Sequence, residues 1–136
     1  MTRSSGILLP VSALPGPCGI GDLGTAAREF IDFLAAAGQR YWQILPLNPP
    51  DSAHSPYLSA STFAGSTDLL SPEPFMARGA LTLDEVRSVD WGGDPMRVDY
   101  GRVHAGKIEL WAAAFAREQA AVTPALRAAL EARPWL

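Results

Sequence analysis

A short hydroxyl-rich stretch carries the side chains best suited to binding a polar ligand. It reads HSPYLSAS over residues 54–61, and its candidate groups are Ser55, Tyr57, Ser59 and Ser61. Sugars are bound by such groups, because hydroxyls exchange hydrogen bonds while the C–H face of a sugar ring packs on an aromatic ring. The residues alone leave a second interpretation open, in which Tyr57 anchors a solvated loop to the core.

The neighbours of this stretch add little chemistry. His54 could bind a ligand, but we favour an imidazole that faces water. Asp51 follows two prolines and is expected to be a turn residue. Cleavage of a glycosidic bond needs two flanking carboxylates, and of the 14 acidic residues only Asp51 lies near this stretch. The sequence therefore predicts sugar-binding residues without a catalytic pair.

Composition argues against several other kinds of site. A net charge of −3 gives no electrostatic case for binding nucleic acid or an anionic membrane, and no apolar run reaches the ~20 residues of a membrane span. Cys18 is the only cysteine, and we expect it to pack in a loop, not to act as a nucleophile. The two histidines lack zinc-ligand spacing. No signal peptide precedes the first apolar run, so we expect a cytoplasmic protein.

The elements that must position this stretch form a β-α-β pattern. The apolar run at 6–9 predicts a buried strand, and prolines and glycines predict a loop over 11–21. Asp22 is expected to cap a helix over 25–37, which Gly38 ends. Its apolar face is Ala27, Phe30, Ile31 and Leu34.

A second strand is expected over 41–45, where aromatic and β-branched residues precede a run of prolines. Trp42 is expected to pack in the core. Strands joined by one helix should be parallel with a right-handed crossover, so the loops at 10–21 and 46–66 should lie side by side. That edge carries the active site in a (β/α)₈ barrel, and a doubly wound sheet would use the same edge.

The rest of the chain is expected to be mostly helical. Thr82 and Glu85 fit a capping box for a short helix that runs through Val89. The other expected pieces are an extended segment at 67–70, an irregular segment at 71–80, a loop at 91–101, a helix at 103–121 and, after Thr123 and Pro124, a last helix at 125–133. In the 103–121 helix, one face should repeat Val103, Lys107, Leu110, Trp111 and Ala114.

A glycine motif at 19–24, GIGDLG, matches G-x-G-x-x-G only superficially. Roughly ten residues separate it from the preceding strand, whereas a dinucleotide fingerprint follows its strand at once. We therefore interpret its glycines as turn formers.

Several motifs follow one another along the chain, and their order indicates a family resemblance that composition alone could not. They read GILLP at 6–10, SALPGPCGIGDLG at 12–24, AGQRYWQILPL at 37–47, SPYLSASTFAGS at 55–66 and VDYG at 98–101. This string closely resembles the N-terminal part of the 4-α-glucanotransferases, the amylomaltases or disproportionating enzymes of the α-amylase clan.

The resemblance implies an α/β fold, the N-terminal part of a (β/α)₈ TIM barrel with the start of an inserted helical subdomain. Residues 1–71 would hold the first β/α units and residues 72–136 the incomplete insertion. It implies transfer of α-1,4-glucan segments between malto-oligosaccharides, from starch or glycogen, by a retaining double displacement without metal or organic cofactor. Ser55 and Tyr57 match residues that contact the donor glucan.

The family's catalytic carboxylates lie on later strands, so no catalytic residue is expected in this chain. The apolar ending, Trp135 and Leu136 after Pro134, also resembles a sequence cut within a longer enzyme. Some family members bind glucan at a secondary site through a tyrosine where this chain has residues 51–54, DSAH, without such a residue. Two alternatives stay open: a non-catalytic glucan-binding module, and a helical domain that binds protein through residues 103–133.

Overall fold

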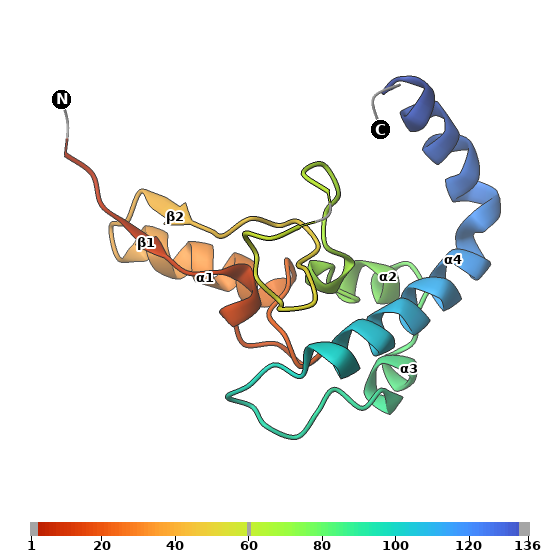
Figure 1. The fold of residues 1–136 in the computed structure, drawn as a ribbon, viewed down its shortest axis with the longest axis horizontal. Helices are drawn as coiled ribbons and strands as arrows, with labels where there is room; N and C mark the ends of the chain where they lie inside the picture. The colour runs from red at the N-terminus through yellow and green to blue at the C-terminus, as the bar shows by residue number, and fades with distance from the viewer. Residues whose placement is uncertain (1–2, 60, 134–136) are drawn as a thin grey trace.

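The computed structural model describes residues 3–59 and 61–133. A two-stranded sheet with one helix forms one end of the molecule, and a group of helices forms the other (Figure 1). Long loops lie between the two parts, so the fold is an α/β unit followed by a helical region.

The first part is the expected β-α-β unit. Strand β1 (Gly6–Leu8) pairs in parallel with β2 (Tyr41–Gln43), and helix α1 (Thr25–Ala36) connects them. Gly6 lies opposite Tyr41, and a Cβ there would lie 2.6 Å from the Tyr41 carbonyl oxygen, so this register needs a glycine. The predicted burial of the first strand was wrong. Ile7 and Leu8 are 41% and 57% exposed, because a two-stranded sheet leaves much of its surface uncovered.

Helix α1 begins at Thr25 and ends before Gly38 as predicted, but its N-cap differs. Gly38 has φ 72°, the left-handed conformation that follows many helices. Asp22 is not the N-cap, because the helix begins after Gly24 and Asp22 Oδ1 accepts from the Gly24 amide. The Thr25 amide instead donates to Glu73 from a distant segment, at 2.9 Å. A tertiary contact has therefore replaced the local cap.

Helix α1 and the following strand share a small core. Val11, Leu14 and Ala27 are buried, and Phe30 and Trp42 pack against them. The Trp42 indole also donates to the Leu9 carbonyl at 2.8 Å, which confirms its expected packing role. Of the predicted apolar face of α1, Ala27 and Leu34 are buried, whereas Ile31 is 51% exposed. The helix thus covers the sheet with a narrower stripe than predicted.

The glycine motif makes close turns, as interpreted. Gly19 has φ 69°. A Cβ on Gly21 would lie 2.2 Å from the Val11 carbonyl oxygen, where the loop folds back on the short 3₁₀ turn Val11–Ala13. These contacts serve loop folding.

The second part contains more helix than predicted. The 67–70 segment is a 3₁₀ turn, η2 (Thr67–Leu69), not an extended piece. Helix α2 (Glu73–Ala77) lies inside the predicted irregular segment. Pro72 is its N-cap and Pro74 lies in its first turn, where a missing backbone N–H costs no helical hydrogen bond.

Helix α3 (Leu83–Ser88) confirms the predicted capping box. Thr82 accepts from the Glu85 amide, and the Glu85 carboxylate accepts from the Thr82 amide. Behind α3 lies the second core, formed by Cys18, Ala80, Leu81, Val86, Leu110 and Ala114.

Helix α4 (Tyr100–Glu131) is one element where two were predicted. It starts at Tyr100, because Asp99 accepts from the Arg102 amide as its N-cap. Pro124 lies inside the helix, which curves along its length (Figure 1). Proline can bend a helix without ending it when the flanking residues favour helix, and alanines surround Pro124. Of the residues predicted to share one face, Val103, Lys107, Leu110 and Ala114 are buried.

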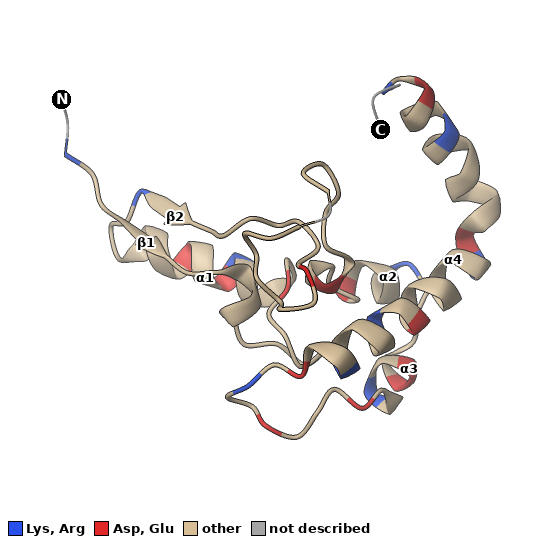
Figure 2. Cartoon of the chain, viewed as in Figure 1, with Lys and Arg blue, Asp and Glu red and all other residues tan. Residues whose placement is uncertain are grey.

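Charged residues are distributed over both parts without a basic stripe, in keeping with the net charge of −3 (Figure 2). Among the described residues, no helix is long and apolar enough to cross a membrane. The apolar ending at residues 134–136, which we expected to mark a cut within a longer enzyme, lies outside the described residues.

Candidate functional site

A cleft lies where the two strands end, between the loops at 10–21 and 46–66. Its volume of about 60 Å³ is well below that of a complete small-molecule site. Both loops and the start of α4 contribute to it, so the loops lie side by side as predicted. The lining residues are Pro10, Val11, Ser12, Ile20, Leu45, Pro46, Leu47, Asn48, Pro50, His54, Pro56, Ser66, Asp68, Leu69 and Tyr100.

The 46–66 loop is held by its own polar side chains. Asp51 Oδ1 accepts from the amides of Ala53 and Ser55 at 3.1 and 3.2 Å, which confirms it as a turn residue. The Asp51 amide donates to the Leu58 carbonyl at 2.8 Å and closes the loop tip. Asp51 is thus committed to the backbone.

Asn48 holds the far side of this loop, a role that sequence reasoning missed. Its side-chain amide lies within hydrogen-bond distance of three carbonyl oxygens, at 2.9, 2.7 and 3.2 Å. They belong to Ser61, Thr62 and Ala64. Asn48 is the only asparagine in the chain and stands between prolines, a position that could have signalled this role.

The structure places Ser55 and Tyr57 beside the cleft. Ser55 is half-buried, and its hydroxyl accepts from the Tyr57 amide at 3.4 Å. The Tyr57 side chain is exposed, with a relative exposure of 72%. The interpretation in which Tyr57 anchors the loop to the core is therefore wrong. Of the described residues 54–57, His54 and Pro56 line the cleft, whereas Ser55 and Tyr57 do not.

The other two serines stabilise the loop. Ser59 donates to the Ser61 carbonyl at 3.0 Å, and Ser61 Oγ accepts from the Ala64 amide at 3.1 Å. Of the predicted hydroxyl set, these two are therefore used within the loop.

His54 stacks on Tyr100, a contact that sequence reasoning did not foresee. The imidazole is exposed, as expected, but its centroid lies 4.3 Å from that of Tyr100, with 10° between the ring planes. His54 has φ 57°, an uncommon conformation for a residue other than glycine. The imidazole is thus the only ring within residues 51–54, a stretch that contains no tyrosine. The stacked pair joins the 46–66 loop to the first turn of α4.

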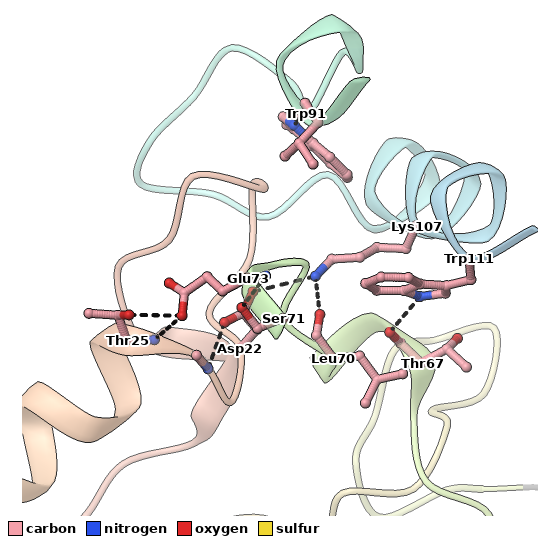
Figure 3. Close-up of polar contacts among 11 residues, drawn as sticks. Asp22, Thr25, Thr67, Leu70, Ser71, Glu73, Trp91, Lys107 and Trp111 are labelled. Carbon is pink, nitrogen blue, oxygen red and sulfur yellow. Dashed lines mark hydrogen bonds and ion pairs between the residues drawn. The ribbon is translucent and has the colours of Figure 1, made fainter. Parts of the chain in front are cut away.

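The segment at 66–70 forms the floor beside this pair, and α4 holds it. Asp68 Oδ1 lies 3.0 Å from His104 Nδ1, and the Trp111 indole donates to the Thr67 carbonyl at 3.1 Å. Lys107 donates to the Leu70 carbonyl between them (Figure 3). Sequence reasoning had placed Asp68 beyond the loop, yet its carboxylate lines the cleft.

Cys18 is a core residue. Its side chain is fully buried, and burial raises the pKa of the thiol, an effect that the nearby Lys107 ammonium partly offsets. A buried thiol of raised pKa is a poor nucleophile, which agrees with its expected packing role. Within the described part of the chain, no group of three histidine, cysteine or acidic side chains could hold a metal ion.

The fold is that of an α/β protein: a parallel β-α-β unit with a small cleft at its strand ends, the edge at which open α/β sheets bind their ligands. A sequence model of the 4-alpha-glucanotransferase family matches residues 9–133. The chain therefore belongs to the 4-alpha-glucanotransferase family.

Individual relatives agree. The chain is 46% identical over 107 residues to the 4-alpha-glucanotransferase of Thermus thermophilus. This match covers 79% of the chain and 20% of the relative. It is 43% identical over 102 residues to that of Streptococcus pneumoniae serotype 4, covering 75% of the chain and 20% of the relative. The chain thus spans about a fifth of the length of these relatives.

A solved structure is also similar. The amylomaltase from Streptococcus agalactiae in complex with acarbose superposes with a TM-score of 0.87 and 35% sequence identity. The match covers 98% of this chain and 28% of that chain. The fold described above is therefore the N-terminal part of an amylomaltase fold.

Proposed function

We propose that the chain is part of a 4-α-glucanotransferase that transfers α-1,4-glucan segments between malto-oligosaccharides. The observation that carries the proposal is the family match over residues 9–133, together with a cleft at the strand ends. In the proposed reaction the enzyme retains the anomeric configuration through a double displacement, without metal or organic cofactor. Its glucans derive from starch or glycogen, and it acts in the cytoplasm.

In this proposal, residues 1–71 supply the first β/α units of a (β/α)₈ barrel and residues 72–136 begin an inserted helical subdomain. The parallel pairing of β1 with β2 through one helix supports the first assignment. The run of helices from α2 to α4 supports the second.

Ser55 and Tyr57 are the proposed contacts to the donor glucan. The exposed Tyr57 ring is free to pack against the C–H face of a glucose unit, and it stands one residue from the cleft lining at Pro56. The carboxylates near the cleft already have partners, since Asp51 binds backbone amides and Asp68 pairs with His104. This supports a chain that binds donor glucan while other parts of the enzyme supply the catalytic acids.

The test is the reaction of maltotriose with the complete polypeptide that contains this chain. We expect release of glucose together with maltopentaose, and no turnover by the 136-residue chain alone. Binding of maltoheptaose by the complete polypeptide without turnover would instead support the non-catalytic glucan-binding module. Turnover by the isolated chain would refute the assignment of the catalytic acids to other parts.

A further inference from the structure

Lys107 combines complete burial with contacts far from its own helix. It is the only lysine in the chain, and its side chain is 0% exposed. The ammonium donates to the Leu70 carbonyl and lies 3.5 Å from Asp22 Oδ2, which is also buried (Figure 3). A charge taken out of water in this way is costly unless its partners are held in place, so the surrounding backbone and Lys107 fix one another.

Three side chains of α4 contact the 67–70 segment. His104, Lys107 and Trp111 follow one another at i, i+3 and i+7, so they share one face of the helix. The His104 side chain is 61% exposed, and the Trp111 hydrogen bond is also open to solvent. The Lys107 side chain is wholly buried, and its contact with the Leu70 carbonyl is charge-assisted, which strengthens it.

The segment held by Lys107 is connected to both loops of the cleft. The Leu23 amide donates to the Leu69 carbonyl at 3.1 Å, which joins the first loop to it. The Ser66 amide donates to the Leu47 carbonyl at 2.7 Å, which joins the two ends of the 46–66 loop. Since Ser66 and Leu69 also line the cleft, a shift of this segment would displace the cleft wall and the loop together.

We infer that Lys107 is a positioning residue for the 46–66 loop, acting through the Leu70 carbonyl without touching glucan. The expected effect on glucan binding rests on the proposed function, whereas the expected effect on the position of the loop does not. The competing explanation is that Lys107 serves only to balance the buried Asp22 charge.

Three variants of the complete polypeptide separate these explanations. Lys107→Met keeps an unbranched side chain that is one atom shorter, and it removes both contacts. Asp22→Asn combined with Lys107→Met also removes the unpaired carboxylate, and the asparagine oxygen can still accept from the Gly24 amide. Arg117→Met is the matched control, because Arg117 also binds one backbone carbonyl and one carboxylate from α4, those of Ala80 and Glu85 in the helical part.

Two readouts are measured on each variant. The first is the rate at which chymotrypsin cleaves after the exposed Tyr57, followed by mass spectrometry, which requires no catalytic activity. The second is KM against kcat for maltotriose. We expect faster cleavage after Tyr57 and a roughly tenfold rise in KM, with kcat changed less, in both lysine variants, because small misplacements of binding groups are costly. The Arg117 control should match the wild type in both.

If the double variant regains the cleavage rate and KM of the wild type, Lys107 only balances Asp22 and the inference is overturned. Because the double variant has no unpaired buried charge, it decides the question even where Lys107→Met alone does not fold. Should the wild type transfer no glucan, the proposed function fails, and the cleavage rates still decide whether Lys107 holds the loop.

Discussion

Helix α4 binds two different regions with two similar cations, and the two contacts differ in their exposure to water. On the loop side, Lys107 binds the Leu70 carbonyl and approaches Asp22, with side chains that are 0% and 8% exposed. On the helical side, Arg117 binds the Ala80 carbonyl and Glu85, with side chains that are 45% and 33% exposed. The chemistry is nearly the same, so the difference isolates the effect of burial.

Because the Lys107–Asp22 contact is buried, water replaces it poorly. The more exposed Arg117–Glu85 contact is more easily replaced by water. Water can take over the hydrogen bonds of Arg117 or Glu85 when the partner is lost, and exposed ion pairs contribute little to stability. The Lys107 and Asp22 side chains are almost wholly buried, so losing either one leaves the other as an uncompensated charge. The loop side therefore depends on a single arrangement of backbone and side chains, which suits the loop that we propose to bind glucan.

The largest expected effect comes from breaking the loop side. Lys107→Met should lower the free energy of unfolding of the complete polypeptide by about 3–5 kcal/mol, because Asp22 is left buried and unpaired. Urea unfolding followed by tryptophan fluorescence measures this loss. Arg117→Met should move the midpoint much less, and equal shifts for the two variants would contradict the difference between the regions.

A smaller effect should separate binding from stability on the loop side. Tyr57→Ala should raise KM for maltotriose by roughly fivefold while leaving the urea midpoint unchanged, because the ring is exposed and stacking contributes about 1 kcal/mol. Tyr57→Phe keeps the ring and should raise KM by about threefold or less. Unchanged kinetics in Tyr57→Ala would argue against its donor-binding role.

The smallest effect is expected on the helical side and depends on pH. The hydrogen bond from Arg117, with those from Thr82, lowers the pKa of Glu85 from 4.5 to about 2. Because the folded-state pKa is lowered, the stabilisation is complete above pH 4.5 and is lost as the pH falls toward 2.

Wild type and Glu85→Gln should therefore differ slightly in urea midpoint at pH 6, and the difference should shrink as the pH falls to 3. A difference that stays constant over this range would show that the Glu85 charge does not stabilise the fold.

Local signals in the sequence were sufficient for the elements whose ends are decided locally. Gly38 and the Thr82–Glu85 capping box fixed the end of α1 and the start of α3. The parallel β-α-β rule was sufficient to bring the two cleft loops together. These features need only neighbouring residues or general handedness.

Contacts between distant residues could not be predicted. Asp22 is a good N-cap by type, but its pairing with Lys107 and the approach of Glu73 to Thr25 gave it another role. The stacking of His54 on Tyr100 joins residues that are far apart in the sequence. The sequence predicted that the only lysine shares a helix face with apolar residues, but it predicted neither the burial of this lysine nor its partners.

The central claim is that the 46–66 loop, held by α4, binds the donor glucan through Tyr57. Its most direct test is the rate of chymotrypsin cleavage after Tyr57 in the complete polypeptide, measured with and without saturating maltoheptaose. We predict that maltoheptaose slows this cleavage several-fold, because a bound glucan covers the exposed ring, while cleavage elsewhere in the polypeptide is unchanged. An unchanged rate after Tyr57 at saturating maltoheptaose would contradict the claim.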